Sequence, residues 1–430
     1  LSFFHAFYIM TYTATTTGFG ELPPAFSDAQ RMWVTFALYF SVVAWVYAIG
    51  ALISLLQDSA FRAVITANRF ATSVRRMREP FYIVCGYGDT GRLVVGAMVR
   101  RGISVVVVDS SQDHINELSL ENLSLFVPGL CADASLPGSL LAAGLEHRKC
   151  AGVIALSDSD HVNLKVAITS KLLNTNTMVI CRAQTHDAQA NMVSFGTDAV
   201  INPFDTFADR FAMALHSPDM HLIYEWLTAI PGTPLAKRID PPHGTWVVCG
   251  YGRFGKAVSR YLQFEGLSTV IVESDPQLTH APKDAIVGRG TEAVTLREAH
   301  IEDAVGIVAG TDDDANNLSI IMTARTLNAG LFMVARQNLR ENDPIFDVAK
   351  LDLVMQRSRI IARRILSLIT SPLLTDFLRL ARHKSNNWAR ELPHIKNLLV
   401  VRYEDLRASP EREMARIVEF LGMEANPEYL

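Results

Sequence analysis

The chain has few cysteines and few charged residues, and neither sign of charge dominates. Its cysteines, Cys85, Cys131, Cys150, Cys181 and Cys249, include no C-x-x-C pair, which favours free thiols in a reducing compartment over a disulfide framework or a zinc site. The histidines form no close pair at metal-ligand spacing, so we predict no resident metal. The formal net charge of −4 on 430 residues argues against a nucleic-acid partner.

Charged residues make up only 20% of the chain and hydrophobic residues 49%, a balance that indicates a membrane segment. Residues 32–56 carry no charge, and a helix of that length spans a bilayer of roughly 30 Å. A buried core helix is the less favoured alternative, because long core helices carry polar positions. Arginines outnumber acids just beyond this run, so we expect the chain to leave the membrane on the cytoplasmic side.

Residues 1–13 are apolar and aromatic but too short to span, which favours a re-entrant half-helix. The stretch TATTTGFGEL follows at residues 13–22. Irregular backbone at membrane depth is tolerated only where it lines a cavity or pore. Gly18 and Gly20 can turn successive carbonyl groups to one side, and such a row can replace the hydration shell of a potassium ion. A reverse turn between two helices is the alternative.

From Pro80 the composition becomes that of a soluble α/β protein, and the pattern then repeats after about 160 residues. Residues 82–85 form an apolar strand pattern, followed by a glycine turn, a helical pattern and a second strand that ends in an acid. Residues 245–274 repeat this unit almost position for position. The sequence therefore predicts two tandem Rossmann-like domains with doubly wound parallel sheets, separated by a proline-marked linker.

Each copy contains G-x-G-x-x-G, with an acid 18 residues after the last glycine. The glycines allow a tight turn, close approach of the backbone to a pyrophosphate and close helix–strand packing, and the acid can bind a ribose hydroxyl. A serine follows each acid, so NADP is disfavoured relative to NAD or an adenine nucleotide. A Rossmann shell kept only for structure is the alternative, more so for one copy than for both. The candidate nucleotide-binding residues are Gly86, Tyr87, Gly88, Asp89, Thr90, Gly91, Asp109 and Asp133 in the first copy and Gly250, Tyr251, Gly252, Arg253, Phe254, Gly255 and Glu273 in the second.

Taken together, the filter-like stretch and the apolar run after it resemble the filter and inner helix of tetrameric potassium channels. The two glycine-motif domains resemble the regulator-of-potassium-conductance, or Trk-type NAD-binding, domains. Thr17, Phe19 and Glu21 stand where those channels usually have valine, tyrosine and aspartate. By this resemblance the selectivity filter would consist of Thr16, Thr17, Gly18, Phe19 and Gly20.

The resemblance implies a homotetrameric pore in the cell (inner) membrane, gated by cytoplasmic Rossmann domains that bind NAD(H), ATP or ADP, with potassium as the permeant ion. The outer helix of such a pore is missing, and Leu1 lies inside an apolar run, so we expect the natural chain to begin upstream. A membrane-anchored NAD-binding regulatory subunit of a separate potassium transporter is the alternative. The expected segments are 1–57 (pore helix, filter and inner helix), 58–79 (linker), 80–216 (first Rossmann-like domain), 217–244 (linker), 245–382 (second Rossmann-like domain) and 383–430 (tail).

The tail, residues 383–430, resembles the C-terminal part of the sulfotransferases, in which a strand ending in Tyr-Glu-Asp-Leu precedes a helix. The phosphate-binding loop and catalytic residues of that family lie upstream in its members, and neither is present here. We therefore expect a short strand–helix fragment without activity. Since the two Rossmann copies also leave no room for a catalytic domain, we predict that the chain is not an enzyme.

Overall fold

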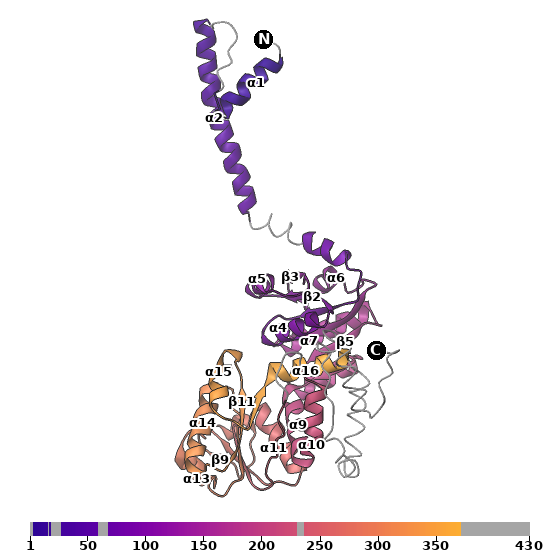
Figure 1. Cartoon of the computed structure of the whole chain (residues 1–430), viewed down its shortest axis with the longest axis vertical. Coiled ribbons are helices and arrows are strands. Elements are labelled where there is room, and N and C mark those ends of the chain that lie inside the picture. The colour runs from indigo at the N-terminus through magenta and orange to yellow at the C-terminus, as the bar shows by residue number, and fades with distance from the viewer. Residues whose placement is uncertain (1–2, 16, 19–26, 59–67, 230–235, 371–430) are drawn as a thin grey trace, which may run out of the picture. The chain divides into compact units, whose positions relative to one another are not determined.

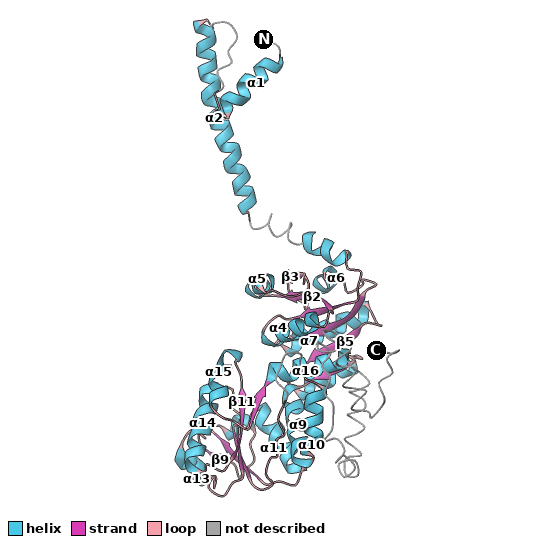
Figure 2. Cartoon of the chain, viewed as in Figure 1, coloured by secondary structure: helices cyan, strands magenta, loops and turns pink. Residues whose placement is uncertain are grey.

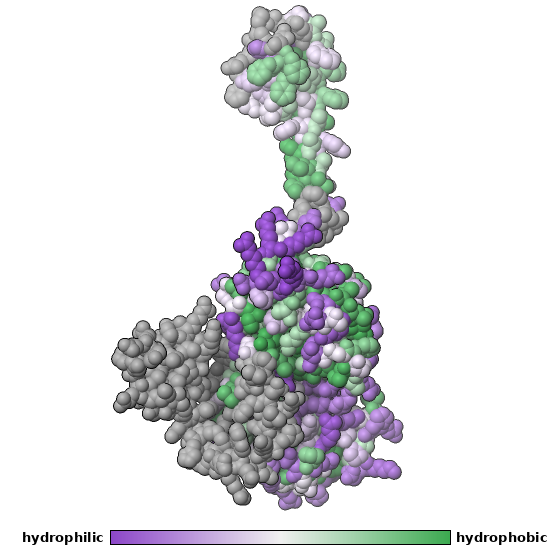
Figure 3. Space-filling view, turned by 90° about the vertical axis from the view of Figure 1, so that its right-hand side faces the viewer, coloured by the Kyte–Doolittle hydropathy of each residue, from purple (hydrophilic) through white to green (hydrophobic). Residues whose placement is uncertain are grey.

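The fold is that of a computed structural model, which describes residues 3–15, 17–18, 27–58, 68–229 and 236–370. The chain divides into two units, residues 1–73 and 74–430. The first unit contains helices α1 (Phe3–Ala14) and α2 (Asp28–Gln57), which pack against each other (Figure 1). Residues Arg31–Gln57 of α2 have a mean hydropathy of 2.1 and are long and apolar enough to cross a membrane. Figure 3 shows their apolar side chains, coloured green, on the surface of this unit.

The second unit contains two six-stranded sheets, visible as two groups of magenta arrows in Figure 2. Each sheet is parallel, and each has the same order, β3-β2-β1-β4-β5-β6 in the first half and β9-β8-β7-β10-β11-β12 in the second. This is the strand order of a doubly wound Rossmann fold. The predicted tandem Rossmann-like fold is therefore confirmed, while the tail, residues 383–430, lies outside the described residues.

The strands are β1 (Phe81–Cys85), β2 (Ser104–Asp109), β3 (Gly129–Cys131), β4 (Cys150–Ala155), β5 (Met178–Arg182) and β6 (Ala199–Ile201) in the first half, and β7 (Trp246–Cys249), β8 (Thr269–Glu273), β9 (Ile286–Val287), β10 (Gly306–Ala309), β11 (Phe332–Gln337) and β12 (Leu353–Gln356) in the second. The central strands are buried on both faces, which explains why they read as continuous apolar runs rather than as alternating patterns.

Helices cover both faces of each sheet. In the first half they are α4 (Asp89–Arg100), α5 (Gln112–Leu120), α6 (Pro137–Ala142), α7 (Asp160–Leu173), α8 (His186–Ser194), α9 (Pro203–His216) and α10 (Pro218–Leu227). In the second half they are α11 (Arg253–Phe264), α12 (Pro276–Thr279), α13 (Ala293–Glu298), α14 (Asp314–Leu327), the 3-10 turn η1 (Arg340–Asn342), α15 (Asp343–Val348) and α16 (Arg357–Thr370). Helix α10 occupies part of the segment expected as a linker, and the expected segment boundaries stay a prediction.

Each half contributes the helix that follows its last strand to the other half. Helix α9 follows the last strand of the first sheet but packs on α11, and α16 follows the last strand of the second sheet but packs on α4 (Figure 1). Ile361 and Ile365 of α16 are fully buried in the core of the first half, and burial of each such side chain contributes about 1.5–3 kcal/mol. In the other direction, Phe211 of α9 packs edge-on against Trp246, with ring centroids 5.1 Å apart. The exchange makes the two halves one interlocked body.

Candidate functional site

The first glycine turn connects β1 to α4 and has the backbone geometry that the sequence predicted. Gly86 has φ of +107°, and a Cβ atom at Gly91 would collide with the carbonyl oxygen of Gly86. Gly88, by contrast, has no atom within 4 Å of the position a Cβ would take. The turn therefore needs glycine at Gly86 and Gly91 for its own packing, and at Gly88 it leaves the backbone open to a ligand at the N-terminus of α4.

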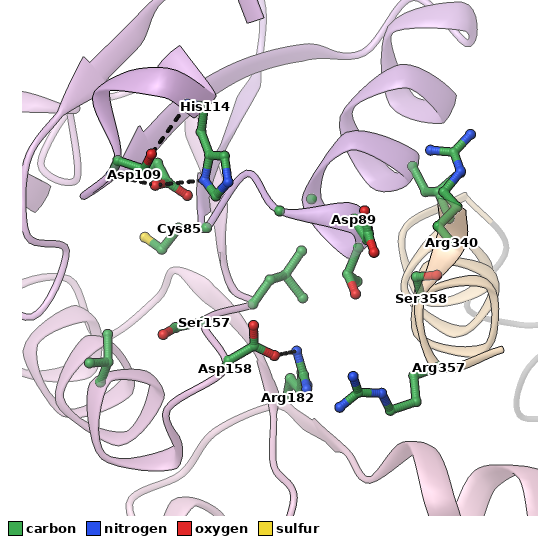
Figure 4. Close-up of a pocket in the computed structure, with 18 of the residues that line it drawn as sticks. Cys85, Asp89, Asp109, His114, Ser157, Asp158, Arg182, Arg340, Arg357 and Ser358 are labelled. Carbon is green, nitrogen blue, oxygen red and sulfur yellow. Dashed lines mark hydrogen bonds and ion pairs between the residues drawn. The ribbon is translucent and has the colours of Figure 1, made fainter. Parts of the chain in front are cut away.

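Asp109 ends β2 beside this turn, as predicted for the ribose-binding acid. Its carboxylate is almost fully buried and accepts hydrogen bonds from the backbone amides of Tyr87 at 2.5 Å and Ser111 at 2.7 Å. The Nδ1 atom of His114 lies 3.0 Å from the same carboxylate (Figure 4). A carboxylate offers about four acceptor positions, so one remains for a ribose hydroxyl.

A cavity of about 510 Å³ lies over the first glycine turn. This volume falls in the range of about 300–1,000 Å³ found for small-molecule sites. Of the predicted first-copy residues, Tyr87 alone does not line it: its ring is buried in the core of the first half. Asp133 lies on the cavity wall, and hydrogen bonds from Ser135 lower the pKa of its carboxyl.

The second half of the chain forms the opposite wall of this cavity. It is lined by residues 337–340 at and after the end of β11, by Asp343, and by residues 356–359 at the junction of β12 and α16. Arg357 and Ser358 face the turn from the tan-coloured α16 in Figure 4. The second half reaches this cavity because the helix exchange packs α16 on α4. Sequence reasoning treated each copy as a separate site and missed these residues.

The second glycine turn repeats the backbone of the first. Gly250 has φ of +90°, and a Cβ atom at Gly255 would collide with the carbonyl oxygen of Gly250. Glu273 accepts hydrogen bonds from the backbone amides of Tyr251 at 2.6 Å and Asp275 at 3.0 Å. The sequence-predicted residues of this copy are therefore also brought together.

The side chains beside the second turn differ from those beside the first. The last two strands pair in the same register in both halves, since Arg182 lies opposite Ile201 and Arg336 opposite Met355. Arg182 therefore corresponds to Arg336 in the repeat, and residues 203–205 correspond to residues 357–359. Phe204 of α9 lies next to the second turn, with its ring centroid 6.4 Å from that of Phe254. The guanidinium groups of Arg253 and Arg336 lie 5.4 and 5.3 Å from the same Phe204 ring. Buried phenyl rings thus stand where the first site has Ser358 and Thr90.

A comparison of the two repeats gives the signal that would have revealed this difference. Pro203-Phe204-Asp205 in the first repeat corresponds to Arg357-Ser358-Arg359 in the second, directly after the last strand. Each triplet faces the glycine turn of the other half. One turn therefore faces arginines and a hydroxyl, and the other faces a phenyl ring and an acid.

In the first unit, the structure describes part of the predicted filter. Gly18 has φ of +61°, a left-handed conformation suited to glycine, and the hydroxyl of Thr17 lies 2.8 Å from that of Thr15. Thr16, Phe19 and Gly20 lie outside the described residues, so the assignment of the filter stays a prediction.

One known protein-family model matches both halves of the second unit. The family model "TrkA-N domain" matches residues 82–203 and 246–357, which together are more than half of the chain. The chain belongs to the TrkA-N domain family. The expected Trk-type relationship is thereby confirmed. The "Ion channel" model matches residues 1–58, and the "Sulfotransferase domain" model matches residues 379–430, outside the described part.

The relatives include potassium channel proteins and Trk system potassium uptake proteins. The chain is 24% identical over 218 residues to "Potassium channel protein 1" of Methanocaldococcus jannaschii, covering 51% of this chain and 64% of that protein. It is 30% identical over 137 residues to a "Trk system potassium uptake protein TrkA homolog" of Methanothermobacter thermautotrophicus, covering 31% of this chain and 63% of that protein. The chain thus spans less than two thirds of the length of these relatives.

Among solved structures, the fold is similar to that of GsuK. The ADP-bound form superimposes with a TM-score of 0.56 at 19% identity, covering 86% of this chain and 90% of that one. The NAD-bound channel gives a TM-score of 0.57 at 17% identity, covering 86% and 77%. At these identities the likeness shows the fold, which agrees with two parallel Rossmann-like sheets after an N-terminal helical unit.

Proposed function

We propose that this chain is a subunit of a potassium channel whose pore is gated by a nucleotide bound at the first glycine turn. The observation that carries the proposal is the cavity over Gly86–Gly91, next to Asp109, in a chain whose residues 1–58 match an ion-channel family. The potassium-channel name of the Methanocaldococcus relative supports the same function. A nucleotide with different affinity for the open and closed states would shift the pore between them.

The exposed apolar surface of α2 supports a place in the cell membrane. Arg75, Arg76 and Arg78 follow it in the chain, which favours a cytoplasmic position for the Rossmann-like halves by the positive-inside rule. A homotetramer is the assembly that the filter-like stretch requires, because four loops surround the ion in such filters. The ADP- and NAD-bound forms of GsuK favour ADP or NAD as the ligand. We assign no catalytic activity to the chain.

Potassium flux through reconstituted protein tests the proposal. The protein is placed in liposomes with a potassium gradient, and flux is measured with and without ADP or NAD. Flux that a nucleotide changes is the expected result. Flux that is the same at every nucleotide concentration would refute gating, and no flux at all would refute the channel.

The filter assignment has its own test, Gly18→Ala. Because Gly18 has φ of +61°, an alanine there costs about 1–2 kcal/mol and disturbs the carbonyl row, so we expect potassium flux to be lost. Gly196→Ala is the matched control: Gly196 has φ of +77° on an exposed turn of the second unit, with open space around its Cβ position. Flux that survives Gly18→Ala unchanged would show that the filter lies elsewhere.

A regulatory subunit of a separate potassium transporter is the second candidate, favoured by the similarity to the TrkA homolog. In that case the purified chain alone would bind a nucleotide but carry no potassium, and it would copurify with a distinct pore protein. Flux through liposomes that contain only this chain would exclude the second candidate.

A further inference from the structure

Arg357 is the first residue of α16 and lines the cavity over the first glycine turn, although it belongs to the second half of the sequence. Figure 4 shows its guanidinium directed into the cavity, toward Arg182 and Asp158. The side chain is half-buried. A planar, permanently charged guanidinium in such a place requires an anion or water around it.

The other strongly held charges on the cavity wall have partners. Arg182 is nearly fully buried, and its Nη1 lies 2.7 Å from Oδ1 of Asp158. Nη2 of Arg359 lies 3.4 Å from Oδ2 of Asp343. The Asp109 carboxylate accepts two backbone amides and His114. Asp158 is therefore engaged by Arg182, and its side chain is 86% exposed. Asp89, at the first position of α4, is a second acid on the cavity wall.

Arg357 itself makes no hydrogen bond or ion pair with any residue in the described ranges of the structure. Burial lowers the pKa of its guanidinium, and repulsion from Arg182 and Arg253 lowers it further. Asp158 and Asp89 act in the opposite direction without cancelling this shift. Within the described part of the chain, the cavity therefore contains a guanidinium that is free to bind a ligand anion.

We propose that Arg357 binds the pyrophosphate of a nucleotide held by the first glycine turn, so that the ligand contacts both halves of the chain. This inference rests on the proposed nucleotide site and adds a residue that the glycine motif does not contain. The glycine turn and the N-terminus of α4 bind the phosphates from one side. The guanidinium of Arg357 binds them from the opposite wall, which α16 forms. ADP and NAD share this pyrophosphate, whereas AMP and adenosine lack it.

The repeat at the second turn supports the assignment. The position that corresponds to Arg357 is Pro203, which offers no donor, and the next residue is the buried Phe204. The second turn thus has no arginine at the position of Arg357, although the guanidinium groups of Arg253 and Arg336 lie beside the Phe204 ring. The two walls therefore differ at the position of Arg357, which only the first site has.

Isothermal titration of the full chain in detergent with ADP, NAD, AMP and adenosine tests this inference. A charge-assisted hydrogen-bonded pair contributes enough for Arg357→Gln to weaken ADP and NAD by about 10- to 100-fold. Adenosine should keep its affinity within about twofold, and Arg357→Lys should recover part of the loss. Arg297→Gln is the matched control, because it removes the same charge from an exposed site in the second half that pairs with Glu302 outside the cavity.

Each outcome of the titration either supports or overturns the role of Arg357. Unchanged ADP and NAD affinity in Arg357→Gln overturns the inference, and so does an equal loss for adenosine, which would indicate a structural role. A loss confined to ADP or to NAD supports it and identifies the ligand. If the unmodified chain binds none of the four compounds, the proposed nucleotide site fails together with the inference. Thermal unfolding of each variant without ligand shows whether the fold is intact.

Discussion

Gly88→Asp should abolish nucleotide binding without harming the fold. Gly88 is the N-cap of α4, with φ of −71° and ψ of −163°, a conformation that any residue adopts. No atom lies within 4 Å of its Cβ position, so the new side chain meets only the cavity. Aspartate is also a favoured N-cap residue, which changes helix stability by only a few tenths of a kcal/mol relative to glycine.

The magnitude follows from Coulomb's law. A carboxylate about 5 Å from one phosphate charge is repelled by about 3 kcal/mol at an effective dielectric constant of about 20. Since about 1.4 kcal/mol corresponds to a tenfold change in affinity, we expect ADP to bind at least about 100-fold more weakly. Isothermal titration measures this change, and thermal unfolding measures the intact fold.

Gly252→Asp is the matched control at the second turn. Gly252 is the N-cap of α11, with φ of −73°, ψ of −163° and open space at its Cβ position. We expect this variant to bind ADP normally, because the position of Arg357 at the first turn corresponds to Pro203 at the second. Normal ADP affinity in Gly88→Asp would refute the reasoning, and an equal loss in both variants would show that both turns bind the nucleotide.

Three further predictions concern the buried contacts between the halves. Phe204→Ala removes a buried ring next to Phe254 and should lower the free energy of unfolding by about 3–5 kcal/mol, measured by urea denaturation; a loss below about 1 kcal/mol would contradict the packing described. Glu225→Gln leaves the buried Arg210 and the half-buried Arg363 without their anion and should cost about 3–5 kcal/mol in the same assay. Burial lowers the pKa of His221 below its usual 6.5, so the unfolded chain binds more protons below that pH and stability falls as the pH falls below about 6.5. Unfolding temperatures between pH 7.5 and 5 should show this fall, and His221→Gln should flatten it; an identical profile in the variant would exclude His221 as its source.

Local patterns in the sequence were sufficient for the two Rossmann-like folds. Apolar strands, glycine turns and acids at the ends of strands recur twice along the chain, and each of these features depends on residues close in sequence. Asp109 and Glu273 could therefore be placed beside their turns before the structure was known, because a strand, turn, helix and strand fold as one unit.

Local sequence patterns could not predict which half of the unit α9 and α16 pack on. An amphipathic pattern shows that a helix has an apolar face, but it does not show which sheet that face covers. Both helices follow strands of one half and pack on the other, and the choice depends on how the two cores fit together.

The site depends on that choice. The sequence by itself determined two glycine turns and distinguished them only by Asp133, which has no counterpart in the second copy. Only the tertiary structure brought Arg357 to the first turn and Phe204 to the second. The physical reason is that contacts between residues about 270 and about 50 positions apart are set by packing of the whole unit, whereas the turns are set by backbone conformation within about six residues.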